Sequence, residues 1–344
     1  MTKQSNRPII LIVDFMEHLP VRASGAIVRG QSFEELIAGF IRAQDVKENS
    51  RESYAKGLRK FLTWLRERNI TSPTRQTILD YKMDLAAAGL SSYSISSYLV
   101  SVRKFFNWLE ATRGTPNISK GIKGAKRARG FRKDPLTLPQ VRELLTSIDR
   151  AALCGLRDYA LITLLAHTGL RTIEALRANI GDLRQQGGEA LLWIQGKGRD
   201  EKDDFVLLTG EPLKAVYKYL AERGPAKKDA PLFSSQSDRN GGGRLTTRSF
   251  SRIIKERLRA IGIDSERLTA HSLRHTAITL ALQAGATIQE AQALARHANI
   301  NTTLIYAHNI DRLKQAPERK IEALISGNIG NIDNIGNMEN EGAR

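Results

Sequence analysis

Residues 268–282 read LTAHSLRHTAITLAL. Apolar side chains recur in this stretch at the three- and four-residue spacing of a helix, which puts His271 and Arg274 on one face. His275 adds the His-x-x-x-His spacing of a zinc site, but Ser272 stands where a zinc protease has its general-base Glu, so no metal is expected. Taken alone, His271 is also explained as a polar residue at the start of a helix.

Residues 293–308 read ALARHANINTTLIYAH, with His297 nine residues before Tyr306. The ANIN segment predicts a break, followed by a short helix over 301–306 and an amphipathic helix over 309–325. An isolated tyrosine at the end of a helix is usually an amphipathic surface residue. Tyr306 is therefore a candidate nucleophile only in combination with the other residues of the set described below.

Upstream, residues 167–177 read HTGLRTIEALR. Gly169 predicts the end of one helix, and Arg171 comes just before the next. Glu174 lies three residues after Arg171, which is one helical turn, so its carboxylate is placed to orient the guanidinium. A purely structural ion pair between the two explains the same pattern.

A β-hairpin is predicted between these helical segments. The strands are expected over 189–194 and 205–208, and the polar turn GKGRDEKDD joins them. This turn carries Lys197 and Lys202. The Gly-Lys-Gly of the turn is not a phosphate-binding P-loop, because that motif's spacing and following Ser or Thr are absent.

The N-terminal half predicts a separate helical unit. Apolar residues at helical spacing over 32–113 indicate four helices, and Trp64 and Trp108 are interpreted as core residues because helical aromatic stripes pack inward. With the hairpin and the helices that follow it, the chain is expected to be mainly α with a small β-hairpin or sheet, an α+β fold.

A basic segment separates the two halves. Residues 112–133 contain eight Lys or Arg residues, four glycines, one proline and no acidic residue, so a regular element is not expected. The segment is either a solvated linker or a strap along a DNA backbone, whose phosphates basic side chains can follow without reading sequence. The candidate DNA-binding residues are Lys120, Lys123, Lys126, Arg127, Arg129, Arg132 and Lys133.

The overall composition points to a polyanionic partner. The 344 residues include 53 Lys and Arg against 36 Asp and Glu, a formal net charge of +17, which attracts nucleic acid. Cys154 is the single cysteine, so an internal disulfide and a cysteine-based zinc site are excluded. No apolar run approaches the roughly 18 residues of a membrane span, and no signal peptide is recognised. A cytoplasmic location, on DNA when bound, is the expectation.

Cleavage of a phosphodiester without metal or cofactor makes specific demands. Negative charge grows on the two non-bridging oxygens, and guanidinium groups are suited to hold them. A nucleophile must attack phosphorus, and the leaving oxygen needs a proton. Each candidate residue is weak evidence by itself, but their ordered set meets these demands: Arg171, Lys197, His271, Arg274, His297 and Tyr306.

In this ordered set the chain resembles the tyrosine recombinase, or phage integrase, family. The motifs are HTGLRTIE, QGKGR, HSLRHT, ARH and NTTLIYAH, and the likeness covers about residues 32–325. It implies a Xer-like recombinase or a mobile-element integrase, with an N-terminal four-helix, SAM-like core-binding domain and a C-terminal catalytic domain. The expected boundaries are 1–31 for an extension, 32–113 for the core-binding domain, 114–135 for the linker, 136–325 for the catalytic domain and 326–344 for a disordered tail.

The resemblance also implies a role for each residue. Tyr306 would attack the scissile phosphate to give a 3′-phosphotyrosine, and Arg171 and Arg274 would hold the non-bridging oxygens. His271 would assist the tyrosine's proton, His297 would donate to a phosphate oxygen, and Lys197 would protonate the leaving 5′ oxygen. Rejoining would need no ATP, and Glu174 would support Arg171.

Two positions stand apart. The family commonly has Leu-Gly-His before its second histidine, whereas Arg296 precedes His297 here, either shifting the backbone or adding a phosphate contact. Lys202 is the alternative to Lys197 as the general acid.

The expected partners are double-stranded DNA recombination sites, further copies of the chain that form a homotetramer on synapsed DNA, and possible accessory proteins. Away from DNA a monomer or weak oligomer is expected, and the helix over 309–325 either docks on a neighbouring subunit or packs on its own domain. The alternatives that remain open are an inactive DNA-binding regulator on the same scaffold and an enzyme like a type IB topoisomerase or telomere resolvase. An RNA-binding protein is a remote third, because aromatic residues make up only 6% of the chain.

Overall fold

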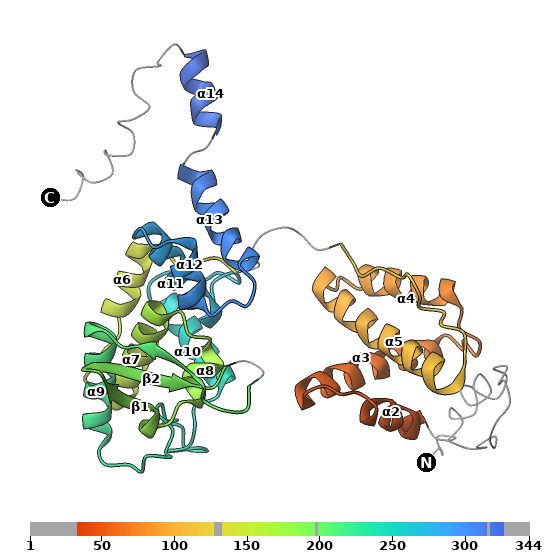
Figure 1. Cartoon of the computed structure of the whole chain (residues 1–344), viewed down its shortest axis with the longest axis horizontal. Helices are drawn as coiled ribbons and strands as arrows, with labels where there is room; N and C mark the ends of the chain where they lie inside the picture. Colours follow the sequence, from red (N-terminus) through yellow and green to blue (C-terminus); the bar gives the residue numbers. More distant parts are fainter. Residues whose placement is uncertain (1–32, 127–132, 197–198, 315–316, 327–344) are drawn as a thin grey trace, which may run out of the picture. The chain divides into compact units, whose positions relative to one another are not determined.

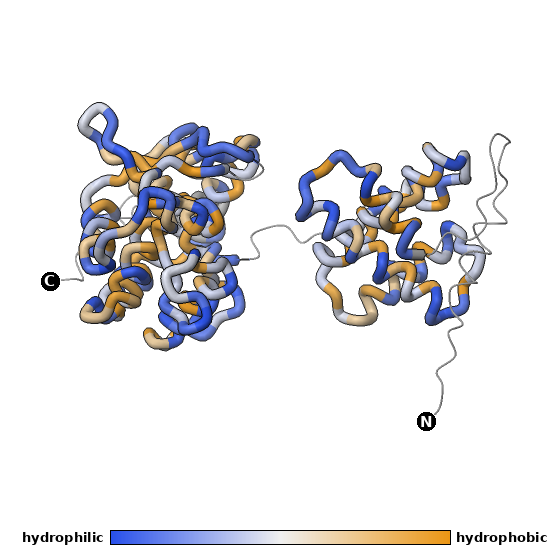
Figure 2. Tube along the Cα trace, turned by 90° about the horizontal axis from the view of Figure 1, so that it is seen from below, coloured by the Kyte–Doolittle hydropathy of each residue, from blue (hydrophilic) through white to orange (hydrophobic). Residues whose placement is uncertain are grey.

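The computed structural model describes residues 33–126, 133–196, 199–314 and 317–326. The chain divides into two compact units, Met1–Arg129 and Gly130–Arg344, and each is described here by itself (Figure 1). Each unit has its own hydrophobic core, and most of its strongly polar segments lie toward the surface (Figure 2).

The described part of the N-terminal unit contains the four helices expected from the sequence. They are α2 (Phe33–Arg42), α3 (Glu48–Glu67), α4 (Arg75–Ala87) and α5 (Ser92–Arg113). Their buried faces meet in one aromatic-rich core, where the rings of Phe40 and Phe105 pack edge to face with centroids 5.6 Å apart. Trp64 and Trp108 both pack against this core, as their interpretation as core residues predicts. Local sequence sets one helix start, because the Thr74 side chain accepts a hydrogen bond from the backbone N–H of Thr77.

The first part of the basic segment lies against this unit. Ile122 is buried in the aromatic core, and its carbonyl accepts a hydrogen bond from Arg103 of α5. The Lys82 ammonium of α4 donates to the carbonyl of Lys123 at 3.0 Å. Residues 114–126 contain no helix or strand, as their glycine content predicts, but tertiary contacts hold them on α4 and α5.

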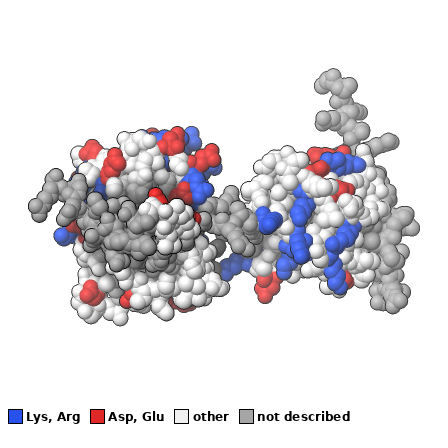
Figure 3. Space-filling view, turned by 90° about the horizontal axis from the view of Figure 1, so that it is seen from above, with Lys and Arg blue, Asp and Glu red and all other residues white. Residues whose placement is uncertain are grey.

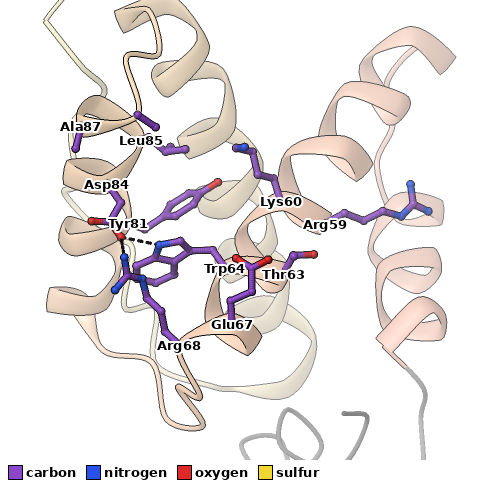
Figure 4. Close-up of a pocket in the computed structure, with 11 residues that line it drawn as sticks. Arg59, Lys60, Thr63, Trp64, Glu67, Arg68, Tyr81, Asp84, Leu85 and Ala87 are labelled. Carbon is purple, nitrogen blue, oxygen red and sulfur yellow. Dashed lines mark hydrogen bonds and ion pairs between the residues drawn. The ribbon is translucent and has the colours of Figure 1, made fainter. Parts of the chain in front are cut away.

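A groove of about 590 Å³ runs between α3 and α4. Figure 4 shows Trp64 and Arg68 both turned toward Asp84, whose carboxylate accepts a hydrogen bond from the indole N–H at 2.8 Å. The groove floor includes the fully buried Tyr81. These contacts join α3 to α4 through polar groups at the rim of the core.

The C-terminal unit combines helices with one small sheet. Its helices are α6 (Leu138–Thr146), α7 (Leu153–Thr168), α8 (Thr172–Arg177), α9 (Gly210–Arg223), α10 (Thr247–Ala260), α11 (Ala270–Gln283), α12 (Ile288–Ala295), α13 (Asn301–Lys314) and α14 (Pro317–Ile325). The short 3₁₀ turn η1 (Ile180–Asp182) precedes the strands β1 (Leu183–Gln186), β2 (Glu189–Ile194) and β3 (Asp204–Leu207). Helix α7 is buried on nearly every side and packs against α9 and α11, so it forms the centre of this core.

The sheet has three antiparallel strands in the order β1-β2-β3. The expected hairpin is β2 and β3, with Leu192 opposite Val206 on the buried face. β1 was not anticipated, because its sequence LRQQ is polar and three of its four residues are exposed. It pairs with β2 through a two-glycine turn, in which Gly187 and Gly188 both have positive φ, the backbone of a tight hairpin.

Helix α13 corrects two expectations, a short helix over 301–306 and a single helix over 309–325. It is continuous from Asn301 to Lys314, and the next helix starts at Pro317. No glycine or proline interrupts NTTLIYAHNIDRLK, whereas proline is favoured in the first turn of a helix. Tyr306 therefore lies in the middle of a helix and not at its end. No helix in the described part of the chain is long and apolar enough to cross a membrane.

Candidate active site

The end of α7 positions the first arginine. Gly169 closes this helix in the left-handed conformation, with φ 60°, and the chain then turns into α8. Arg171 immediately precedes α8, and its guanidinium lies 2.6 Å from Glu174 Oε1. The other carboxylate oxygen accepts the backbone N–H of Arg171 at 2.8 Å. Because Glu174 is fully buried, it holds both the backbone and the side chain of Arg171 in place.

Arg274 comes from α11 and meets the same turn. Its side chain is buried and donates to the Gly169 carbonyl at 2.6 Å and to the Ala295 carbonyl at the end of α12. Burial, then the nearby Arg171 and Arg296 charges, lower the pKa of Arg274 to about 10. A buried cation fixed by carbonyls and crowded by like charges is suited to receive an anion.

Arg296 occupies the position where the resembled family commonly has glycine. It ends α12 with φ 52° and ψ 47°, the left-handed conformation that costs an L-residue about 1–2 kcal/mol. Its side chain turns into the protein and lies 3.1 Å from Glu174 Oε2. Burial alone would raise the pKa of Glu174, but Arg296 and the hydrogen bonds from Arg171 outweigh it and hold that pKa below its usual range.

Tyr306 lies inside the unit, contrary to the surface position typical of an isolated helical tyrosine. It is 4% exposed and packs beside Ile278 and Ala295. Its hydroxyl is 2.6 Å from Nδ1 of His275. Burial raises the pKa of Tyr306 to about 12, while the charge of Arg274 opposes the rise. The phenol is therefore neutral, and its hydroxyl shares a hydrogen bond with His275, which was assigned no catalytic role from the sequence.

The histidines around Tyr306 are neutral at pH 7. Burial, followed by His271, Arg274 and His297, lowers the pKa of His275 to about 4. Burial, followed by Arg274, Arg171 and Arg296, also lowers the pKa of His297 to about 4. A neutral His275 can accept the tyrosine proton at Nδ1 only if its own hydrogen is on the other ring nitrogen.

A buried hydroxyl orients His297. The Oγ1 of Thr303, on α13, lies 2.9 Å from Nδ1 of His297, and the His297 ring stacks on Tyr306 with centroids 6.2 Å apart. His271 is more exposed and meets the His275 ring edge-on at 4.7 Å. Partial desolvation, then Arg274, lowers the pKa of His271.

The two candidate lysines of the hairpin differ in what the structure shows. Lys197 lies outside the described residues. Lys202 forms an ion pair with Asp182 of η1, and its side chain is 27% exposed. That pairing gives Lys202 a structural contact between the hairpin and η1.

Of the seven basic residues proposed for DNA contact, Arg127, Arg129 and Arg132 lie outside the described residues. Lys120, Lys123 and Lys126 are exposed on the segment that follows α5. Lys133 belongs to the C-terminal unit, where its ammonium donates to the Glu266 carbonyl at 2.5 Å.

A basic face of the N-terminal unit adds to this set. Figure 3 shows Lys and Arg side chains gathered on one side of that unit. On α3, Lys56 and Lys60 are exposed one turn apart, and the Lys60 ammonium lies 5.6 Å from the Tyr98 ring of α5. The α3 cations were not identified from the sequence, although their spacing of four residues was a usable signal.

Comparison with known proteins identifies the family of the chain. Residues 135–312 match the model of the phage integrase family, and residues 33–113 match the phage integrase N-terminal SAM-like domain. The tyrosine recombinase XerD of Listeria monocytogenes serotype 4b (strain F2365) is 31% identical over 80% of this chain and 93% of its own length. A tyrosine recombinase of Synechococcus elongatus is 30% identical over 75% of this chain and 84% of its own length.

Solved structures share the fold. The site-specific recombinase XerH, in a post-cleavage complex with palindromic difH substrate, superposes with a TM-score of 0.68 at 22% identity. That match covers 92% of this chain and 97% of XerH. The Tn1549 transposon integrase, in complex with transposon right-end DNA, gives a TM-score of 0.62 at 20% identity over 79% of this chain and 93% of the integrase. The chain described here belongs to the phage integrase family of tyrosine recombinases, enzymes that break and rejoin DNA.

Proposed function

We propose that this protein is a site-specific recombinase that cuts and rejoins DNA through a 3′-phosphotyrosine at Tyr306, without metal or ATP. The observation that carries the proposal is the cluster around the Tyr306 hydroxyl. It brings a neutral phenol within 2.6 Å of the His275 ring, next to a buried arginine, Arg274. A phenol among guanidinium and imidazole groups is equipped for nucleophilic attack on a phosphate.

In the cleavage step, Tyr306 oxygen forms a bond to phosphorus and the bond from phosphorus to the 5′ oxygen breaks. Arg171 and Arg274 hold the non-bridging oxygens, and His297 donates a hydrogen bond to one of them. His275 holds the hydroxyl, and His271 beside it takes up the proton that Tyr306 loses as its oxygen bonds to phosphorus. Lys197 supplies the proton that the leaving 5′ oxygen takes up.

Binding of the scissile phosphate alters this balance of charge. The depressed pKa values of Arg274 and His297 reflect burial among like charges. An incoming phosphate offsets that repulsion and so raises both pKa values, which favours the protonated form of His297 as a hydrogen-bond donor. The bound phosphate therefore supplies the negative charge that this cationic site lacks in the free protein.

The proposed substrate is double-stranded DNA carrying a recombination site. The exposed cations Lys120, Lys123 and Lys126, with Arg127, Arg129, Arg132 and Lys133, would contact the phosphate backbone. Two duplexes would be joined in a homotetramer. The exposed apolar residues Ile321 and Leu324 of α14 are suited to dock on a neighbouring subunit.

The test is covalent capture. Duplexes that the protein binds are first selected to map its site, and a nicked suicide substrate with that site is then incubated with the full chain. We expect a denaturant-stable protein–DNA adduct, lost in Tyr306→Phe while DNA binding persists. Tyr217→Phe is the control, because Tyr217 is an exposed tyrosine on α9. An adduct that survives in Tyr306→Phe would refute the assignment of the nucleophile.

Two alternative functions give different outcomes. An inactive regulator binds the selected DNA and forms no adduct in the wild-type chain. An enzyme like a type IB topoisomerase relaxes supercoiled plasmid that lacks the selected site and does not exchange strands between two sites. We expect exchange that depends on the site in both partner duplexes.

A further inference from the structure

The side chain of Arg296 enters the arginine site. Its exposed fraction is only 12%, although the residue occupies a helix end where a long cation could reach solvent. Nη1 donates to the Leu294 carbonyl at 2.9 Å. Nη2 lies 3.1 Å from Glu174 and 3.5 Å from the Gly169 carbonyl, which Arg274 also contacts. Arg296 thus shares one partner with each of the two arginines proposed to bind phosphate.

Sharing Glu174 has an electrostatic consequence. One carboxylate oxygen binds the Arg171 guanidinium, and the other binds Arg296 and the Arg171 backbone. With Arg274 included, three guanidinium groups surround the single buried carboxylate of Glu174, a net charge of +2 before the half-exposed Asp204, 4.0 Å from Arg296, is counted. Without Arg296 the net charge of the cluster would be +1, and Glu174 would neutralise Arg171 alone.

A further contact points to the sheet. Among the described residues, Nε of Arg296 is buried without a hydrogen-bond partner, and a carboxylate oxygen of Asp204 lies 4.0 Å from it. Asp204 begins β3, directly after the turn that carries Lys197. Arg296 therefore lies between α8, the end of α7 and the hairpin.

We propose that Arg296 is a positioning residue of the phosphate site, which keeps Arg171 available to the scissile phosphate by sharing Glu174. This role rests on the proposed function. The alternative is that Arg296 only ends helix α12. Glycine adopts the left-handed conformation at a helix end at a lower cost than arginine does. The inward contacts of the Arg296 side chain therefore explain why arginine is present at this position.

The test compares Arg296→Gly with Arg296→Lys. Glycine relieves the backbone conformation and removes the charge, whereas lysine keeps a cation beside Glu174. We expect Arg296→Gly to form the Tyr306 adduct about 10- to 100-fold more slowly at saturating protein. Its melting temperature, in which the relieved backbone conformation offsets the lost ion pair with Glu174, checks that the variant folds. Arg296→Lys should retain more activity than the glycine variant, since it preserves the charge but not the forked geometry.

A second readout separates a charge effect from a loss of packing. Titration of His297 by NMR in the DNA-free protein should show a higher pKa in Arg296→Gly, because Arg296 is one of the charges that lower it. The pKa should change less in Arg296→Lys. A loss of packing without a change of charge would leave the His297 pKa at its wild-type value.

The outcomes distinguish this inference from the proposed function. If the wild-type chain forms no adduct, the proposed function fails. If the wild type forms the adduct and Arg296→Gly forms it at the same rate, Arg296 has no positioning role. A slower glycine variant with an unchanged His297 pKa would equally overturn the inference.

Discussion

The two units differ in the polar groups that they bury. In the described part of the N-terminal unit the buried polar side chains are all hydroxyls, such as Ser101 and Thr115. The C-terminal unit buries ionisable groups, including Asp158, Glu174 and Arg274. Burying a charge costs several kcal/mol unless it is paired. The N-terminal unit is therefore held together by packing, whereas the C-terminal unit also holds paired charges in its interior, both at the candidate site and at Asp158 away from it.

The largest expected effect is loss of Arg274. Arg274→Met keeps a side chain of similar length but removes the donors to the Gly169 and Ala295 carbonyls and the buried charge. Adduct formation should fall by a factor on the order of 10² to 10³, the usual cost of removing a transition-state donor. Single-turnover cleavage on the suicide substrate measures it. Cleavage within threefold of the wild type would show that the buried charge serves stability alone.

A buried ion pair away from the site tests, through the free energy of unfolding, how much the paired charges inside the C-terminal unit stabilise it. Asp158 binds Arg157 at 2.6 Å and Arg257 at 2.9 Å, and its own side chain is 3% exposed. Asp158→Asn should lower the free energy of unfolding by about 3 kcal/mol, because it leaves two arginines without their carboxylate. Denaturant titration measures the loss. Asp238→Asn, at an exposed position, is the control and should stay within about 0.5 kcal/mol of the wild type.

The contact between Tyr306 and His275 is expected to have an intermediate effect. His275→Leu removes the acceptor, and cleavage should fall about tenfold, in line with about 1.5 kcal/mol for a buried hydrogen bond. His275→Asn places an amide oxygen near the position of Nδ1 and should recover most of the rate. Equal loss in both variants would instead indicate that His275 must accept the proton itself. Rates measured across pH separate these two roles.

The buried histidines also predict a pH dependence of stability. Their pKa is about 4 in the folded protein against 6.5 for an ordinary histidine, so the unfolded chain binds protons first as the pH falls. The stability that they contribute is fully present above about pH 6.5 and is lost as the pH falls toward about 4. Thermal melting should show this decline, and His275→Asn should make it shallower. A decline of unchanged slope would exclude His275 as a contributor.

The smallest effect is expected on the free energy of unfolding of the N-terminal unit, where the substitutions change only side-chain packing. A Cβ added to Gly57 of α3 would lie 2.3 Å from the Ser101 Oγ of α5, so Gly57→Ala should cost about 1 kcal/mol or more. A Cβ added to Gly39 would meet Trp108 at an ordinary 3.8 Å, so Gly39→Ala should instead stabilise its helix by about 0.5–1 kcal/mol. Denaturant titration of both variants, with cleavage activity as a check, completes the comparison. Matching stability changes would show that helix propensity outweighs the close approach.

The amino-acid sequence alone predicted the four N-terminal helices, the β2–β3 hairpin and the helix that carries His271 and Arg274. Helical periodicity and capping residues are local, so four helices over 32–113 and the helix that carries His271 and Arg274 could be predicted from short windows. The spacing of Arg171 and Glu174 likewise predicted their contact, because residues three apart on a helix share a face.

Tertiary structure alone decided where these groups meet. The polar strand β1 has no periodicity of its own and exists because β2 offers a pairing edge. The burial of Tyr306, its contact with His275 and the inward turn of Arg296 join segments that are distant in the chain. No local pattern encodes such contacts, because burial and the pairing of charges depend on which other elements pack around a residue.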